Sequence, residues 1–200
     1  MYRPPAFRED ERDTLLAMAR EIGFASIVSP SCDGLQATHA PVIVRDDAIE
    51  FHVAKANPHW GAVDFEGDTV VMFQGPSAYV HPGWYPTKAA TGRVVPTWLY
   101  TAVHVRGRLQ QLRADELSRH LVELTDENEA GRERPWAVGD APADYLEKME
   151  RAIVGLRVPV ASVEGVRKLN QHKREDDFAG VREGLRRERP SVAALMDELG

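Results

Sequence analysis

The sequence predicts a mainly β fold with flanking helices, an α+β class in which an antiparallel sheet curves toward a barrel. Short apolar stretches with strand-like composition follow one another through the first half of the 200-residue chain, joined by turn-length connections. Helical patterns lie at the start of the chain and again after these stretches. A run of short strands with helices set apart from it is typical of such barrels.

Composition and charge exclude several classes of protein. The chain has 25 Lys and Arg against 31 Asp and Glu, a net charge of −6, which argues against coating nucleic acid through bulk charge. Cys32 is the single cysteine, so neither a disulfide framework nor a zinc site built on several cysteines is expected. The sequence lacks both an apolar run long enough for a membrane helix and a secretory signal. We therefore expect a cytoplasmic protein with no membrane partner.

The first quarter of the chain predicts one helix followed by an antiparallel meander. Apolar residues at helical spacing in 9–22 predict the helix, and Gly23 is placed to end it. Asp33-Gly34 is a hairpin signal, and Pro41 is expected to break the returning strand or to mark it as an edge strand. The expected strands are 24–29, 35–44 and 48–54.

The middle of the chain predicts a capped helix, a broken strand and a long loop. Asn57 is a helix cap with Pro58 at the first helical position, so a short helix is expected to run to about residue 65. An apolar strand over 69–74 is expected to break at Gly75-Pro76 and to resume at 78–81. Residues 82–96 read as a loop, and a connection of this length in a compact domain is typically functional or disordered.

The remainder predicts one long strand, one final strand and four helices. The long strand is expected over 97–112, where side chains alternate between the two faces of the strand, with Trp98, Tyr100, Ala102 and His104 on one face. The expected helices are 114–129, 142–152, 174–188 and 191–199, and the final strand is 154–163.

Aromatic residues are concentrated in the middle of the chain. Nine of the 15 lie between Phe51 and Tyr100. They fit either the core of a small barrel or a site for a planar ligand, because Trp and Tyr combine a flat apolar body with a polar tip. Trp84, Tyr85 and Trp98 lie on or beside the long loop, so they are better ligand candidates than Phe51 or Phe73.

The segment from His52 to Trp60 is a candidate phosphate site. A strand ends, Lys55 follows, and a helix capped by Asn57 begins. Free N–H groups at a helix start favour anions, and Lys55 would add a full charge. The alternative is an ordinary cap beside a solvated lysine.

Other chemistry finds little support in the residues. The seven histidines show no metal-ligand spacing, Cys32 has an acidic neighbour that disfavours a thiolate, and catalytic motifs are missing. We therefore assign neither catalytic nor metal-binding residues. Residues 167–189 hold eight basic and five acidic side chains. This tail could contact DNA phosphates, or it could be an exposed helix laced with ion pairs, which is the interpretation we favour.

Several strings follow one another in a recognisable order. They include Thr38-His-Ala-Pro41, Ala54-Lys-Ala-Asn-Pro-His-Trp60, Phe73-Gln-Gly-Pro-Ser-Ala-Tyr-Val80, Trp84-Tyr-Pro86, Arg93-Val-Val-Pro-Thr-Trp98, Val103-His-Val-Arg-Gly107 and Asp140-Ala-Pro-Ala-Asp-Tyr145. From the N-terminus to about residue 185, these strings resemble the PaiB-like family of FMN-binding negative transcriptional regulators.

The resemblance implies a fold, an assembly and a function. The fold would be an antiparallel, Greek-key-like split β-barrel, similar to that of pyridoxamine-phosphate oxidases, over 1–165, with a helical extension over 166–200. The protein would be a homodimer with FMN at the subunit interface and would lower transcription. A flavin-dependent oxidoreductase acting on a small molecule is the alternative function.

The resemblance also assigns roles to particular residues. Thr38, His39 and Ala40 would face the flavin ring, while Lys55, Asn57 and Trp60 would contact the phosphate and ribityl chain. Tyr79, Trp84, Trp98 and Tyr100 would pack near the flavin. Lys168 and Gln171 are further candidates for cofactor binding, and they match a late Lys-x-Ser-Gln-Asn motif in part, because Asn170 and His172 replace its Ser and Asn.

Overall fold

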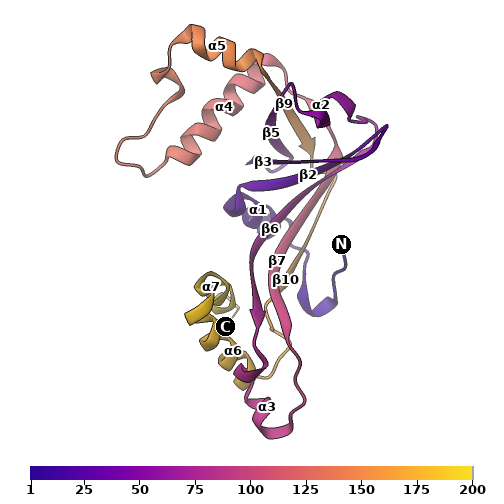
Figure 1. Cartoon of the computed structure of the whole chain (residues 1–200), viewed down its shortest axis with the longest axis vertical. Helices are drawn as coiled ribbons and strands as arrows, with labels where there is room; N and C mark the ends of the chain where they lie inside the picture. Colours follow the sequence, from indigo (N-terminus) through magenta and orange to yellow (C-terminus); the bar gives the residue numbers. More distant parts are fainter. Residues whose placement is uncertain (200) are drawn as a thin grey trace. The chain divides into compact units, whose positions relative to one another are not determined.

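The computed structural model describes residues 1–199, which form two compact units (Figure 1). The first unit combines Met1–Glu11, Gln74–Val103 and the described residues from Glu164 onward. The second unit combines Arg12–Phe73 with His104–Val163. No helix among the described residues has both the length and the apolar character needed to cross a membrane.

The strands of the described chain form two sheets, so the α+β class is confirmed. Pairings within both sheets, such as β2 with β3 and β5 with β9, are antiparallel. The first sheet has the order β1 (Arg8–Glu9), β10 (Ser162–Lys168), β7 (Thr97–Arg108), β6 (Asp68–Val80), β2 (Phe24–Ser31) and β3 (Gly34–Pro41). The second has the order β4 (Ile43–Val44), β5 (Ala48–Ala54), β9 (Ile153–Pro159) and β8 (Gln110–Gln111).

The predicted meander is divided between these two sheets. Its first hairpin, β2–β3, turns at Cys32-Asp33 as expected, and β3 ends at Pro41. The chain then enters the second sheet, where β4 pairs with β5. Between the two sheets the N–H of Val42 donates to Gly23 O at 2.9 Å, outside any strand ladder. A meander within one sheet was therefore the wrong expectation.

The strand break and the long loop expected in the middle of the chain have a different form in the structure. β6 continues through Gly75-Pro76, since the fixed φ of proline is compatible with extended backbone where no ladder bond needs its nitrogen. The expected loop over 82–96 contains a 3₁₀ turn, Pro82–Trp84 (η2), and a short helix, Pro86–Thr91 (α3). Each begins at a proline, the residue suited to a first helical position, and Gly92 ends α3 with φ 68°.

The expected final strand over 154–163 is instead two strands, β9 and β10, in different sheets. The first helix and the other helices follow the sequence pattern more closely. Gly23, with φ 61°, follows the first helix as predicted. The helices are α1 (Arg12–Ile22), α2 (Pro58–Ala62), α4 (Ala114–Glu129), α5 (Ala143–Arg151), α6 (Glu175–Glu188) and α7 (Pro190–Asp197), with further 3₁₀ turns η1 (Pro5–Phe7) and η3 (Val138–Asp140).

Each unit has its own apolar core. In the first unit, one face of β6 and β7 packs with α6 and α7, and the buried side chains include Val80, Leu99, Val181, Leu185 and Met196. In the second unit, α1 and strands of both sheets contribute buried residues such as Leu15, Ile27, Ile49, Phe73 and Leu156. Phe51 and Phe73, the weaker ligand candidates among the aromatic residues, belong to this core, because each is 1% exposed.

Candidate functional site

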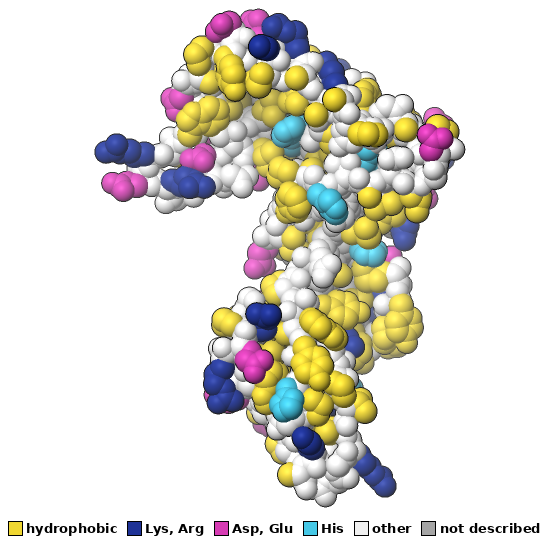
Figure 2. All heavy atoms as spheres, in the orientation of Figure 1, with side chains coloured by type: hydrophobic (Ala, Val, Ile, Leu, Met, Phe, Trp, Pro, Cys, Tyr) yellow, Lys and Arg dark blue, Asp and Glu magenta, His cyan; other side chains and the backbone are white. Residues whose placement is uncertain are grey.

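An aromatic face on β7 is open to solvent in the first unit. The strand buries alternate residues, beginning with Leu99 and Thr101, which confirms the predicted alternation. Trp98, on the other face, is 56% exposed, and its ring lies edge-on to that of Tyr79 of β6 with centroids 6.2 Å apart. Figure 2 shows apolar side chains gathered over the strands of this unit. Trp98 is therefore not a core residue of the described chain.

Lys168 of β10 lies beside this face. Its Nζ is 5.9 Å from the ring centroid of Tyr100, which shares a face of β7 with Trp98. A cation at this distance from an aromatic ring is attracted to the ring's face. The structure thus brings together Tyr79 with Trp98, and Tyr100 with Lys168, as an aromatic surface with one positive edge.

A second group of predicted residues forms a hydrogen-bonded cluster in the second unit. Asn57 caps α2 by accepting from the N–H of His59 at 2.9 Å, and its Nδ2 donates to Thr38 Oγ1 at 3.1 Å. The same hydroxyl lies 3.0 Å from His59 Nδ1. Thr38 is on β3, so the cluster joins the strand and the helix start that the sequence singled out.

His59 is the residue in this cluster that sequence reasoning did not select. It is 4% exposed, and burial lowers its pKa, which favours the neutral imidazole. If the Thr38 hydroxyl donates to Nδ1, the ring proton is on Nε2. Nε2 is buried and has no hydrogen-bond partner in the described protein. A buried donor without an acceptor is suited to a ligand oxygen. In the sequence, His59 stands out by its place two residues after the cap, within the segment His52–Trp60 that is the candidate phosphate site.

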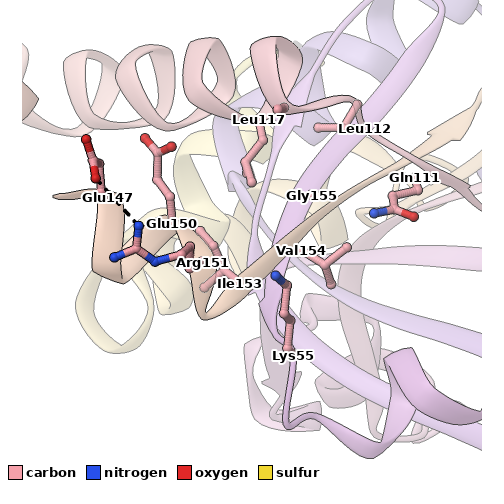
Figure 3. A pocket seen from close by; sticks show the side chains of 11 residues that line it. Lys55, Gln111, Leu112, Leu117, Glu147, Glu150, Arg151, Ile153, Val154 and Gly155 are labelled. Atoms are coloured by element: carbon pink, nitrogen blue, oxygen red, sulfur yellow. Dashed lines mark ion pairs between the residues drawn. The ribbon is translucent and has the colours of Figure 1, made fainter.

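Lys55 is available for a ligand phosphate. It follows β5 and lines a pocket of about 400 Å³ with residues of α4, α5 and β9 (Figure 3). Arg151 in this pocket pairs with Glu147 at 3.5 Å, and Glu150 accepts from Ser118 at 3.3 Å. Lys55 Nζ, by contrast, makes no ion pair or hydrogen bond with the described residues. Its charge is uncompensated by any acid of the described chain.

The other predicted residues have contacts within the protein. His39 is exposed and its Nδ1 lies 2.9 Å from Ser26 Oγ, whereas Ala40 is buried. Trp60 packs edge-on to Phe65, with centroids 5.7 Å apart. Trp84 is partly buried against the core of the first unit. The amide of Gln171 accepts from Leu169 N and donates to Arg167 O. Roles for these residues toward a flavin stay predictions.

The basic tail is laced with ion pairs, as favoured from its sequence. Arg167 pairs with Glu198 at 2.7 Å, and both Arg182 and Arg186 pair with Asp197 at 3.2 and 3.0 Å. Arg174 pairs with Asp176 at 3.1 Å. These contacts satisfy half of the tail's basic side chains within the chain itself.

The fold is that of split-barrel proteins, several of which bind flavins. The structure superimposes on the FAD and heme binding protein of Mycobacterium smegmatis with a TM-score of 0.60 at 13% identity, over 86% of this chain and 78% of that one. A conserved hypothetical protein of Mycobacterium tuberculosis gives a TM-score of 0.61 at 12% identity, over 88% and 95%. At such identities the likeness shows a shared fold, and the split-barrel expectation is confirmed.

The sequence comparison defines the family within this fold. Residues 1–162 match the family described as "Putative FMN-binding domain". The chain is 32% identical over 203 residues to Protease synthase and sporulation protein PAI 2 of Bacillus subtilis, covering 100% of this chain and 96% of that protein. An uncharacterized protein of Aspergillus fumigatus is 31% identical over 207 residues, with 80% and 79% covered. The chain therefore belongs to this FMN-binding, PaiB-like family, and FMN is its cofactor.

The residues present fit that cofactor. The open aromatic face suits the flat apolar ring of a flavin. The uncompensated Lys55 and the unpartnered His59 Nε2 suit an anionic or oxygen-rich group such as a phosphate or ribityl chain. The aromatic face belongs to the first unit, and Lys55 and His59 belong to the second unit. Each group offers one kind of contact that FMN requires.

Proposed function

We propose that this protein is a homodimeric FMN-binding regulator that lowers transcription of its target genes. The observation that carries the flavin site is the exposed aromatic face of β7, because a 56%-exposed Trp98 beside Tyr79 has no core role. The negative regulator role rests on the family resemblance. A protein of the cytoplasm with no membrane partner is part of the same proposal.

The family resemblance assigns each group a distinct role toward FMN. Trp98 and Tyr100 would stack near the flavin ring, and Lys55 would hold the phosphate through a charge-assisted contact. Asn57 and Thr38 would position His59, since both are hydrogen-bonded to it. Bound FMN supplies a redox-active ring. These roles are supported by exposure, missing partners and the positions the family resemblance assigns.

The homodimer is proposed because the aromatic face needs a cover. Exposed apolar patches of monomers are commonly interaction surfaces, and obligate homodimer interfaces often exceed about 2,000 Å². A partner subunit packed on Tyr79 and Trp98 would remove both rings from water. The family resemblance also places the flavin at a subunit interface, which would make each site dependent on both chains.

The regulator proposal includes contact between DNA and the basic side chains of the tail. The ion pairs of Arg167, Arg182 and Arg186 leave these guanidinium groups partly neutralised. Gel-shift assays with genomic fragments, run with and without FMN, test the proposal. Retention of specific fragments at physiological salt is expected for a direct regulator. Purely non-specific, salt-sensitive binding would contradict it.

A flavin-dependent oxidoreductase is the second candidate. The observation that favours it is the same aromatic face, since this face could hold the redox-active ring of FMN. Oxidation of NADPH by the FMN-loaded protein tests this function against binding without turnover. Oxidation that exceeds the rate with free FMN, and that falls when Lys55 is replaced, would support the enzyme. A rate equal to that of free FMN would contradict it.

A further inference from the structure

A small pocket in the first unit shares Lys168 with the aromatic face and has further features that the FMN proposal does not explain. Its volume is about 260 Å³, and Phe7, Tyr85, Lys168, Asn170, His172 and Lys173 contribute to its lining. Pockets for drug-sized ligands have volumes of about 300–1,000 Å³. This one therefore suits a single ring better than the three fused rings and ribityl phosphate of FMN.

The pocket is positively charged and lacks acidic lining residues. Lys168 Nζ lies 6.0 Å from the ring centroid of Phe7, and Lys173 Nζ lies 5.5 Å from that of Tyr85. Neither ammonium pairs with an acid of the described chain. Burial and then the two lysines lower the pKa of His172, whose ring lies edge-on to Phe7 at 5.0 Å. The site consequently favours an anion with an apolar, planar body.

Asn170 adds a buried hydrogen-bonding group to the pocket. Its side chain is 0% exposed, and its Nδ2 donates to the phenolic oxygen of Tyr85 at 3.1 Å. Its Oδ1 is buried without a hydrogen-bond partner in the described protein. Asn170 has φ 65°, a conformation that asparagine tolerates better than most residues. A buried acceptor left unpaired is costly, so it calls for a donor from a ligand.

We propose that this pocket binds a small aromatic carboxylate that carries an amino or hydroxyl group. The carboxylate pairs with Lys168 and Lys173, and the ring packs against Phe7 and Tyr85. The N–H or O–H group of the ligand donates to Asn170 Oδ1. This site and its ligand class are independent of whether the protein regulates transcription or oxidises a substrate.

Anthranilate, which has a carboxylate beside an amino group on one ring, is the probe for this proposal. Its binding to the full-length protein is followed by calorimetry and by its own fluorescence, beside benzoate, which lacks the donor, and aniline, which lacks the charge. We expect anthranilate to bind about fivefold or more tightly than benzoate, because benzoate leaves Asn170 Oδ1 unpaired. Aniline should bind more weakly still. Equal affinity for all three compounds would overturn the proposal.

Two variants test the residues. Lys173→Gln should weaken the binding of anthranilate by about tenfold or more. Lys88 is an exposed lysine of α3 outside the pocket, so Lys88→Gln should leave the affinity for anthranilate unchanged. Asn170→Gly keeps the positive φ without strain, and it should reduce the affinity for anthranilate to that for benzoate. Circular dichroism shows whether this variant is folded, and if it is not, Lys173→Gln decides alone.

FMN titrations keep this test separate from the flavin site. We expect Lys173→Gln to leave FMN affinity unchanged, and saturating FMN to leave anthranilate bound. Displacement of anthranilate by FMN would overturn the proposal by making the pocket part of the flavin site. Failure of FMN to bind at all would count against the flavin site while leaving the anthranilate result intact.

Discussion

Trp98 is a large apolar side chain that the fold leaves in the open. Trp98→Leu should lower the free energy of unfolding by less than about 1.5 kcal/mol, the upper range for an aromatic pair such as the one it makes with Tyr79. If the ring quenches a bound flavin, the same variant should raise the emission of bound FMN. Both quantities can be measured on one sample, by denaturant titration and by flavin fluorescence.

Leu99→Ala is the matched control on the opposite face of β7. Leu99 is 0% exposed, so its truncation should cost about 2–5 kcal/mol of stability. It should not change the emission of FMN that remains bound. A large stability loss for Trp98→Leu with unchanged emission would remove Trp98 from the flavin site.

Lys55 carries the proposed phosphate contact. Lys55→Ala should weaken FMN binding by about 1.5–3 kcal/mol, because a charge-assisted hydrogen bond is lost at a site where no other described group pairs with that charge. Titration of apo-protein with FMN measures the effect, and Lys88→Ala on exposed α3 is the control. Equal FMN affinity in the two variants would exclude Lys55 from the site.

His120 makes stability depend on pH. It is 0% exposed, with Nε2 at 3.2 Å from His52 Nδ1. Burial first, then His52 and Arg45, lower its pKa from 6.5 to about 4. Between these values the unfolded chain binds a proton that the folded chain does not, so stability is complete above pH 6.5 and falls as pH drops toward 4. The loss contributed by His120 should reach about 3 kcal/mol.

Denaturant titrations across this pH range measure the slope of the free energy of unfolding against pH. His120→Leu should reduce the slope, because the variant has no imidazole to protonate at this position. His52 has its own lowered pKa, also from burial, so a smaller slope should persist. An unchanged slope in His120→Leu would show that other groups cause the acid sensitivity.

Helix α6 packs closely on the turn that carries Trp84. A Cβ added at Gly184 would lie 2.4 Å from Trp84 Cδ2, and one at Gly180 would lie 2.2 Å from Trp84 O. Gly184→Ala should therefore cost about 1–3 kcal/mol, although the same change in an open helix usually stabilises. Thermal unfolding measures this effect. Gly61→Ala in α2, with open space around the new methyl group, is the control and should be neutral or slightly stabilising.

Local patterns predicted most elements, and contacts between distant segments account for what they did not. The boundaries of α4 and α6 follow from helical spacing, and the cap at Asn57 follows from residue type. The change of sheet after Pro41 depends on which strands pair, and a single strand does not encode its partner. The division into 1–165 and 166–200 stays a prediction.

The candidate site, too, was predicted from the sequence only where local patterns were sufficient. Residue type and position selected Lys55, Asn57 and Trp98, but they did not separate exposed Trp98 from Tyr85, which is 2% exposed. Asn170 meets Tyr85 across 85 positions of sequence, and His59 meets Thr38 across 21. Such pairs are brought together by tertiary folding, so no local motif could reveal the unpaired atoms beside them.

The exposed aromatic face of β7 predicts a dimer. Covering the aromatic face of β7 should produce one species near twice the chain mass of 22.3 kDa. Sedimentation at micromolar protein measures it. The double variant Tyr79→Glu with Trp98→Glu should shift the species toward the monomer, since charges in an apolar interface are costly when unpaired. A stable dimer in that variant would place the interface elsewhere.

The central claim is that FMN binds to this chain at a site that the dimer completes. Sedimentation velocity of the FMN-mixed protein, detected in the visible absorption of the flavin, tests it most directly. We expect the flavin absorbance to move with a species near twice 22.3 kDa, and the absorbance left behind to increase in Lys55→Ala. Flavin absorbance that moves with a 22.3 kDa monomer, or that does not sediment with the protein at all, would contradict it.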